Sequence, residues 1–315
     1  MNAKKPRIVV FGSLNFDYVM WAARLPKKGE TIRGNRFGTF IGGKGANQAV
    51  QAARLGAQTY MIGRIGSDIM GESVMKSLLS NGVKTDYLKI DPEKGTGTAC
   101  IMVDDQGENY LMITSEANGN CQKWDLDDAI EVIKSADVLI TQLETTMEMA
   151  KYALELAKDN NVKTILNPAP TVEVPKSIFE IADIITPNET EAEFHSGIRQ
   201  TADLNEWSNK VYEKFRCFGV EEMIMTLGKK GAFIGTENEK TIINAYSGIN
   251  AVDSTAAGDS FNAALAVALA EGKTLGDAVR FANAAGALTV SAAGAQSSLP
   301  SRQEVEEFIL KYKER

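Results

Sequence analysis

The feature that most constrains the fold of this chain is a regular alternation of short apolar runs with longer runs of mixed polarity. From Thr59 to Asn167 this pattern predicts a strand followed by a helix, several times over. Alternating strands and helices form a parallel sheet with helices on both faces. The segments that carry the pattern are 59–65, 71–81, 125–134, 137–142, 147–160 and 163–167. The sequence therefore predicts an α/β fold with a doubly wound, mostly parallel sheet.

Polar side chains follow several of the predicted strands. The first strand, 7–11, is almost continuously apolar, and Asn15 and Asp17 come shortly after it. Glu144 follows the apolar run 138–140 in the same way. In open α/β sheets, ligands bind beyond the carboxyl ends of the strands. Asn15 and Asp17 are candidates for hydrogen bonding a polyol, although Asn and Asp are also favoured in ordinary capped turns.

Two segments break the alternation and predict a separate small sheet. Residues 30–41 and 96–113 have a strand-like pattern with glycine turns, and 104–107 is typical of a hairpin turn. We predict a small antiparallel β lid, formed by inserted segments of about 16–41 and 96–118. One apolar face of such a sheet must be covered by substrate or by another subunit.

A glycine-rich turn opens an alanine-rich helix at residues 42–56. The turn matches the spacing of a phosphate-binding P-loop as far as Lys44, but Gly45 stands where a magnesium-binding Ser or Thr is needed. A dinucleotide-binding fingerprint fails because its third glycine is absent and the first strand is too far away. We reject both motifs. The turn still brings backbone groups, with Lys44 and Asn47 beside them, close to a sugar.

The segment 251–262 is the strongest candidate for catalysis. It leads directly into the apolar run 263–270, which predicts a tight turn at the start of a buried helix. The first N–H groups of a helix have no partner within it and bind anions well. Asp259 lies in this first turn, where a carboxylate would repel phosphate unless it accepts a proton from an attacking hydroxyl. Asp in a first turn is also common for stability alone, so this segment by itself leaves both interpretations open.

Two later segments fit a nucleotide and its metal ion. Asn188 and Glu191 are three residues apart at a predicted helix start, so they share a face. An amide and a carboxylate oxygen suit a hydrated magnesium ion whose other ligands are phosphates. The turn 227–231 follows the predicted strand 223–226, and its glycines would admit a nucleotide close to the backbone or form a plain hairpin.

Composition excludes several classes of function. The 315 residues carry a net charge of -7, which argues against nucleic-acid and anionic-membrane partners. Three widely spaced cysteines indicate neither a disulfide framework nor a zinc site. His195 is the only histidine, so a carboxylate is the natural candidate for a base. No stretch approaches the length of a membrane span, and we expect a cytoplasmic protein.

Together these motifs carry a family resemblance. The two main signatures are Gly42-Gly43-Lys44-Gly45-Ala46-Asn47-Gln48-Ala49 and Val252-Asp253-Ser254-Thr255-Ala256-Ala257-Gly258-Asp259-Ser260-Phe261. Shorter matches lie at 15–17, 142–144, 167–170, 186–191, 226–228 and 294–298. On these residues the chain resembles the ribokinase-like (PfkB) sugar kinases over essentially its whole length.

The resemblance implies one kinase domain over residues 1–315 that uses ATP, Mg²⁺ and a K⁺ activator. The implied reaction is transfer of the ATP γ-phosphoryl group to the O5 hydroxyl of D-ribose. The resemblance also implies a homodimer clasped through the β lid.

The resemblance further implies a role for each matched residue. The sugar would contact Asn15, Asp17, Gly43, Lys44, Gly45, Asn47 and Glu144. The base would be Asp259, beside an anion hole at Ala256, Ala257 and Gly258. The nucleotide would contact Asn188, Thr226, Leu227, Gly228, Lys229, Lys230, Gly231, Gly258 and Asn283. Magnesium would lie near Asn188 and Glu191, and potassium near Asp253, Thr255, Thr289, Ala292, Gly294 and Ser298.

The sequence departs from the family pattern at three positions. Asn283 replaces a frequent histidine at the adenine contact, and Glu116 replaces a common glycine near the lid. Ala292 replaces a larger residue in the potassium loop, where the ligand expected from the family is a backbone carbonyl.

Two alternatives stay open. The same chemistry could act on 2-deoxyribose, another pentose, a hexose or a nucleoside. Asn15 and Asp17 favour a polyhydroxylated pentose, because buried amide and carboxylate groups would stay unpaired against a deoxy sugar. A non-catalytic sugar sensor on the same fold would be expected to lose Asp259 or the magnesium residues, and all of them are present.

Overall fold

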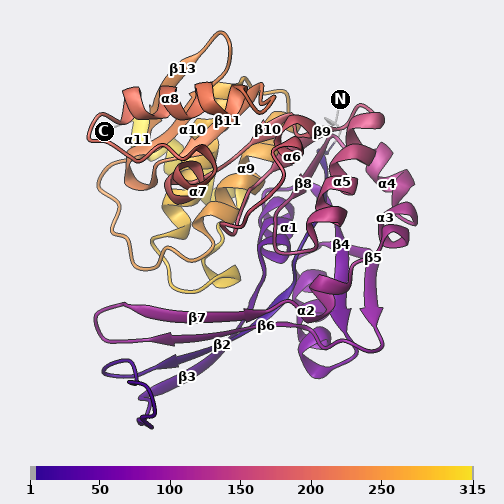
Figure 1. Cartoon of the computed structure of the whole chain (residues 1–315), viewed down its shortest axis with the longest axis vertical. Coiled ribbons are helices and arrows are strands. Elements are labelled where there is room, and N and C mark those ends of the chain that lie inside the picture. The colour runs from indigo at the N-terminus through magenta and orange to yellow at the C-terminus, as the bar shows by residue number, and fades with distance from the viewer. Residues whose placement is uncertain (1–4, 314–315) are drawn as a thin grey trace.

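The computed structural model of the chain describes residues 5–313, so the predicted domain limits at residues 1 and 315 lie outside it. Within the described residues, a nine-stranded sheet forms the main body, with helices on both faces (Figure 1). The strand order is β13-β12-β11-β10-β9-β8-β1-β4-β5, and every pairing is parallel except the two that involve β12. The strands are β1 Arg7–Phe11, β4 Gln58–Gly66, β5 Lys84–Asp91, β8 Val138–Thr141, β9 Lys163–Leu166, β10 Ile184–Ile185, β11 Glu222–Thr226, β12 Gly231–Gly235 and β13 Lys240–Asn244. The predicted doubly wound, mostly parallel α/β fold is confirmed.

The central strands are apolar throughout because both faces of the sheet are covered. In β1, Ile8 and Val10 join the core on one face, and Val9 and Phe11 join the core on the other. Helices α1, α2, α9, α10 and α11 contribute to the first core, and helices α3 to α8 contribute to the second. None of the helices within residues 5–313 is long and apolar enough to cross a membrane.

The helices vary from one turn to four turns in length. They are α1 Lys44–Arg54, α2 Ile69–Ser80, α3 Lys123–Asp127, α4 Ile130–Lys134, α5 Met147–Asp159, α6 Ser177–Ile181, α7 Glu189–Ser196, α8 Leu204–Arg216, α9 Ala257–Ala270, α10 Leu275–Thr289 and α11 Arg302–Lys313. Short 3-10 helices lie at η1 Glu116–Asn120, η2 Gly228–Lys230 and η3 Gln296–Ser298.

Four strands form a second, smaller sheet that extends away from the main body (Figure 1). They are β2 Asn15–Trp21, β3 Arg36–Gly42, β6 Gly97–Val103 and β7 Asn109–Thr114, in the order β3-β2-β6-β7. The two outer pairings are antiparallel, and the central pairing of β2 with β6 is parallel. Asn15 and Asp17 therefore open a strand rather than a capped turn, and their side chains share one face of the small sheet.

The loop after β1 and the start of α1 approach each other so closely that only glycine fits. Gly43 precedes α1 with a φ of 86°, and a Cβ there would lie 2.7 Å from the backbone nitrogen of Asn15. A Cβ on Gly45 would lie 2.7 Å from backbone atoms of Gly12 and Ser13. Because the contacts are with backbone atoms, no side-chain rotation can relieve them. The glycine-rich turn is thus required by packing, and it holds the first turn of α1 against the end of β1.

We predict that Gly45→Ala destabilises the protein by about 1 to 3 kcal/mol, because the added methyl group overlaps the neighbouring loop. Gly276→Ala is the matched control, since Gly276 also lies in a first helical turn but has nothing within 4 Å of its Cβ position. Alanine is the better helix former, so the control should gain up to about 1 kcal/mol. Denaturant unfolding of the two variants and the unmodified protein gives both values. Equal stability of the two variants would contradict the packing argument.

Candidate active site

Three helix N-termini and the carboxyl ends of several strands meet at one cavity of about 200 Å³. Lys44 opens α1, Asn188 caps α7, and Asp259 lies in the first turn of α9. This is the edge at which an open α/β sheet is expected to bind its ligands. The cavity is lined by Lys44, Asn167, Ala169, Thr186, Asn188, Glu191, Thr226, Ser254, Ala256, Gly258, Asp259 and Asn262. The structure thus brings together predicted catalytic, sugar, nucleotide and magnesium residues from distant parts of the chain.

Asp259 is a buried acid of this cavity. Helix α9 begins directly after Ala256, whose left-handed φ of 61° turns the chain sharply into the helix. Asp259 is only 7% exposed, and its two carboxylate oxygens accept hydrogen bonds from the side-chain amides of Asn47 at 2.9 Å and Gln48 at 3.1 Å. Burial raises the pKa of Asp259 to about 6, although Lys44 and both amides act in the opposite direction. The carboxylate is therefore mostly charged at neutral pH and able to accept a proton.

Backbone N–H groups at the start of α9 face the same cavity. The Ala257 N–H donates to the Ser254 carbonyl at 3.2 Å, so the turn itself uses this donor. The next two N–H groups, those of Gly258 and Asp259, are among the donors that a helix N-terminus leaves without an intrahelical partner. Gly258 lines the cavity, and nothing lies within 4 Å of its Cβ position. An anion can therefore approach the backbone at Gly258.

Lys44 and Glu144 form a partly buried ion pair beside Asp259. One Glu144 oxygen accepts a hydrogen bond from the Ser13 hydroxyl at 2.5 Å and another from the Lys44 backbone N–H at 3.2 Å. The other oxygen lies 3.7 Å from the Lys44 ammonium. Burial disfavours the charge on Lys44, but the negative charges of Asp259, Glu144 and Glu191 hold its pKa above the usual value. A permanent positive charge therefore stands among three carboxyl groups.

Asn15 and Asp17 lie at the junction between the small sheet and the main body. The Asn118 amide donates to the Asn15 side-chain oxygen at 2.8 Å, and the Asn118 oxygen accepts the Leu14 N–H at 2.9 Å. The buried Oδ1 of Asp17 has no hydrogen-bond partner within the described part of the chain. Burial, with repulsion from Glu144, raises the pKa of Asp17 to about 7. An unpaired buried acceptor of this kind calls for a donor such as a ligand hydroxyl.

Asn188 and Glu191 form a capping box at the start of α7. The side chain of each accepts the backbone N–H of the other at 2.9 Å, and the Asn188 amide donates to the second Glu191 oxygen at 2.9 Å. Burial raises the pKa of Glu191 to about 7. Within residues 5–313, no group of three or more His, Cys, Asp and Glu side chains is arranged to hold a metal ion. Because both Glu191 oxygens are engaged, this pair fits a hydrated Mg²⁺ that also has phosphate ligands, rather than a cage of protein ligands.

Six of the nine predicted nucleotide residues, 226–231, lie in or directly beside the turn between β11 and β12. Thr226 ends β11 and lines the cavity, and the turn that follows contains η2. Gly231 has a φ of 108°, and a Cβ there would lie 2.0 Å from the Ile243 carbonyl oxygen. Asn283 donates its side-chain amide to the same carbonyl at 3.2 Å and so ties α10 to β13. The turn is a true hairpin, and strand packing alone accounts for the glycine at 231.

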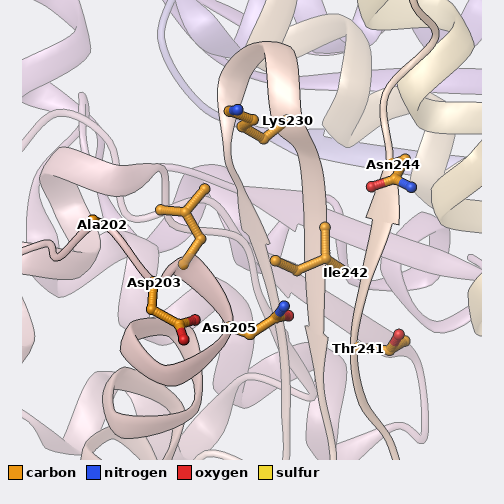
Figure 2. Close-up of a pocket in the computed structure, with 8 residues that line it drawn as sticks. Ala202, Asp203, Asn205, Lys230, Thr241, Ile242 and Asn244 are labelled. Atoms are coloured by element: carbon orange, nitrogen blue, oxygen red, sulfur yellow. The ribbon is translucent and has the colours of Figure 1, made fainter.

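A larger cavity, of about 750 Å³, lies at the open edge of the main sheet (Figure 2). Lys230 is the one predicted nucleotide residue that lines it. Asp203 also lines it, but its carboxylate accepts the Glu206 N–H at 3.0 Å and so caps α8. In Figure 2 the labelled polar side chains of Asp203, Lys230 and Asn244 do not converge on a common point. The smaller cavity, where buried charged groups meet, is the better candidate for chemistry.

Asp253 holds together the loop that was predicted to bind potassium. One of its oxygens accepts from the Thr255 N–H at 2.9 Å and hydroxyl at 2.7 Å, and the other accepts the Gly294 N–H at 2.9 Å. Burial would raise the pKa of Asp253, but these hydrogen bonds hold it below its usual value. Hydrogen bonds within their own turns are made by Thr289, Ala292 and Ser298. The structure thus joins Asp253, Thr255 and Gly294 directly through hydrogen bonds.

Comparison with known proteins decides the family. A family model described as pfkB family carbohydrate kinase matches residues 5–302, nearly the whole chain. The chain belongs to the pfkB family of carbohydrate kinases. The resemblance inferred from the sequence is confirmed, and the chain is a carbohydrate kinase.

The similar proteins include both ribokinases and a deoxyribokinase. Ribokinase of Haemophilus influenzae is 39% identical over 302 residues, which cover 96% of this chain and 98% of that protein. Deoxyribokinase of Salmonella typhi is 32% identical over 303 residues, which cover 96% and 98%. The structure of Arabidopsis thaliana ribokinase complexed with ribose and ATP has a TM-score of 0.91 at 33% identity, over 97% of this chain and 99% of that chain.

The cavity of this pfkB family kinase also contains polar residues to which the sequence assigned no role. The Asn167 amide donates to the Thr186 carbonyl at 3.2 Å, and the Thr186 hydroxyl donates to the Asn262 side-chain oxygen at 2.5 Å. Asn167 and Thr186 directly follow β9 and β10, and Asn262 lies about one helical turn after Asp259. Their places at strand ends and at helical spacing were the available signals.

We predict that Asp17→Asn stabilises this kinase at pH 8. The pKa of Asp17 in the folded protein, about 7, lies above its unfolded value, so the stability linked to its proton is present at low pH and lost as the pH rises through about 7. The variant should exceed the unmodified protein by about 1 to 3 kcal/mol at pH 8 and match it near pH 4. Denaturant unfolding at both pH values measures the difference. A variant that is less stable at pH 8 would show that burial of this carboxylate is not costly.

Proposed function

We propose that this kinase transfers the γ-phosphoryl group of ATP to the O5 hydroxyl of D-ribose and so produces D-ribose 5-phosphate. The observation that carries the proposal is the placement of Asp259, a buried carboxylate that lines the same cavity as Lys44 and the helix-start residue Gly258. Phosphorylation of an alcohol needs a base and an anion site side by side. The ribokinase relatives, and the ribose and ATP bound to the Arabidopsis structure, support ribose and ATP as the substrates.

In this proposal, the sugar lies between the small sheet and the start of α1. Asp17 Oδ1 and Asn47 Oδ1 are buried acceptors without a partner within the described residues, and both would accept hydrogen bonds from ribose hydroxyls. Lys44 and Glu144 supply a donor and an acceptor beside them. The proposed sugar contacts are Asn15, Asp17, Gly43, Lys44, Gly45, Asn47 and Glu144.

The proposed reaction is a direct displacement at the γ-phosphorus. Asp259 accepts the O5 proton as the bond from O5 to phosphorus forms, while the bond from the γ-phosphorus to the bridging oxygen breaks and ADP leaves. The Lys44 ammonium and the Gly258 N–H, within the proposed anion hole at Ala256 to Gly258, would stabilise the negative charge on the transferring group, whereas the Ala257 N–H already donates to the Ser254 carbonyl. Mg²⁺ held near Asn188 and Glu191 would neutralise charge on the phosphates.

Further residues would bind the nucleotide and the activating cation. The nucleotide contacts are Asn188, Thr226, Leu227, Gly228, Lys229, Lys230, Gly231, Gly258 and Asn283. The proposed potassium loop consists of Asp253, Thr255, Thr289, Ala292, Gly294 and Ser298. Asp253 and Thr255 lie just before α9, so a cation there would help to fix the turn that presents Asp259.

The small sheet is proposed to act as a lid and as the contact between two copies of the chain. Phe37, Met20, Met102 and Tyr110 are register neighbours across its four strands, and each is 36% to 58% exposed. An apolar row of this kind is unfavourable in water. A second copy would cover it, which supports a homodimer.

The acceptor is the part of the proposal with a specific competitor. The deoxyribokinase relative makes 2-deoxyribose a second candidate, with the same base and anion site. The unpaired acceptors at Asp17 and Asn47 favour the sugar with more hydroxyls, because a missing hydroxyl leaves a buried group unsatisfied. Other pentoses, hexoses and nucleosides are weaker candidates. A catalytically silent sugar sensor is disfavoured because Asp259, Asn188 and Glu191 are all present in the cavity.

The acceptor is tested by an assay of ADP release with ATP and magnesium. We predict the highest kcat/KM on ribose, lower values on 2-deoxyribose, fructose and adenosine, and a higher rate with potassium than without it. Equal or better turnover of another acceptor would support the kinase activity but reject ribose as the preferred acceptor. No turnover of any acceptor would favour the sensor.

The base is tested by Asp259→Asn. We predict that kcat falls by about 100- to 10,000-fold, because proton transfer is lost, while the Kd for ribose changes little. Asp277→Asn is the matched control, since Asp277 occupies the same third position of α10, after a glycine, but lies on the surface. The control should retain the full kcat. An Asp259→Asn variant that keeps most of its rate would show that Asp259 is only a helix-starting acid.

A further inference from the structure

Gln48 connects Asp259 to the interior of the protein. Its side-chain Nε2 donates one hydrogen bond to Asp259 Oδ1 at 3.1 Å and one to Asn167 Oδ1 at 3.3 Å. Its oxygen accepts a hydrogen bond from the Gln142 amide at 2.7 Å. Gln48 and Gln142 are both completely buried. Both polar atoms of the Gln48 side chain therefore have partners, as a buried amide requires.

The orientation of the Gln48 amide is fixed from the backbone. Asn167 donates its amide nitrogen to the Thr186 carbonyl, which is only an acceptor, so the Asn167 oxygen must face Gln48. Because the Asn167 oxygen can only accept, the group of Gln48 that contacts it must be the amide nitrogen. The same nitrogen also contacts the Asp259 carboxylate. If the Gln48 amide were reversed, its oxygen would face both the Asp259 carboxylate and the Asn167 oxygen. The hydrogen bond from Gln142 stabilises the observed orientation from the other side.

The packing around Gln142 leaves little room for its amide to move. A Cβ on Gly12 would lie 2.0 Å from the Gln142 side-chain oxygen, so even a methyl group on the neighbouring loop would displace it. Gln142 follows β8, and Gly12 follows β1, its partner in the sheet. The sheet itself thus anchors the end of the chain of hydrogen bonds that reaches Asp259.

We propose that Gln48, held by Gln142 and Asn167, is a positioning residue that orients the Asp259 carboxylate for proton transfer. The inference rests on the proposed role of Asp259 as the base. Gln48 donates to one carboxylate oxygen and Asn47 donates to the other, so the two amides of α1 together set the plane of the carboxylate. Loss of the Gln48 donor leaves Asp259 free to rotate and removes a hydrogen bond that stabilises its charged form.

Other charged groups face Asp259 and are unchanged by a substitution at Gln48. They are Lys44 on α1, Glu144 after β8 and Glu191 on α7. Lys44 favours the charged form of Asp259, and Glu144 disfavours it. The effect of Gln48 is therefore measured as a difference between variants that share this background.

The first test compares Gln48→Met with Gln51→Met. Gln51 is the matched control, because it lies one turn further along α1, is equally buried, and donates instead to the Pro300 carbonyl at 3.1 Å. We expect Gln48→Met to lower kcat by about 10- to 100-fold, the loss of a hydrogen bond to a charged group, with an unchanged Kd for ribose. Gln51→Met should keep the unmodified kcat even where both variants lose the same thermal stability. Equal kcat values for the two variants would overturn the proposal.

The second test asks whether Gln142 acts through Gln48. Gln142→Met alone should lower kcat by about 2- to 10-fold. In the Gln48→Met background the same substitution should have no further effect on kcat, because the residue that it orients is gone. Fully multiplicative effects of the two substitutions would show that Gln142 does not act through Gln48.

A third measurement detects the hydrogen bond between Gln48 and Asp259 without relying on catalytic turnover. In protein labelled with ¹³C at aspartate side chains, the Asp259 carboxyl signal is assigned from its absence in Asp259→Asn and titrated in each variant. The proposal predicts a higher pKa for Asp259 in Gln48→Met and no change in Gln51→Met, and an unshifted pKa in both would overturn it. Failure of the proposed function is distinct, since it would appear as an unmodified protein that does not phosphorylate ribose, or as an active Asp259→Asn variant.

Discussion

The architecture of this kinase depends on burying one carboxylate where two helices begin. A buried charge is costly unless it is paired and hydrogen-bonded. Asp259 meets this requirement through α1, which contributes the amides of Asn47 and Gln48 and the positive charge of Lys44. These groups reach Asp259 only if α1 and α9 pack closely, and the buried alanines of both helices allow that approach. The close packing of α1 against α9 thus supplies the hydrogen bonds and the positive charge that the buried Asp259 requires.

Other features of the site also reduce stability in favour of function. Burial raises the pKa values of Asp17 and Glu191, as it does for Asp259, so charged forms of all three are held in an unfavourable environment. Two residues near the site have left-handed backbones without being glycine, Ala256 with a φ of 61° and Glu116 with a φ of 45°. The resemblance predicts glycine at position 116, and the left-handed backbone of Glu116 is the conformation that glycine adopts at least cost. Strain of this kind is retained where a site requires it.

Local patterns predicted the sheet and part of the site. The alternation over residues 59–167 identified the parallel sheet, because burial on both faces leaves a signature in neighbouring residues. The supporting hydrogen bonds left no such signature. Asn118 supports Asn15 across 103 positions, and Gln142 reaches Gln48 across 94. No spacing rule connects residues so far apart, and only the folded topology brings them together. The parallel pairing of β2 with β6 could not be predicted for the same reason. Five elements, β3, α1, β4, α2 and β5, lie between these two strands in the sequence.

The pH dependence of kcat, with ribose, ATP and magnesium all saturating, tests the central claim most directly. Asp259 must be deprotonated to accept the O5 proton. We therefore predict a rate that falls as the pH is lowered, because protonation of the buried Asp259 carboxylate removes the base, and that stays constant on the alkaline side. A rate that is unchanged between pH 8 and pH 5, with the protein still folded, would contradict a buried carboxylate base.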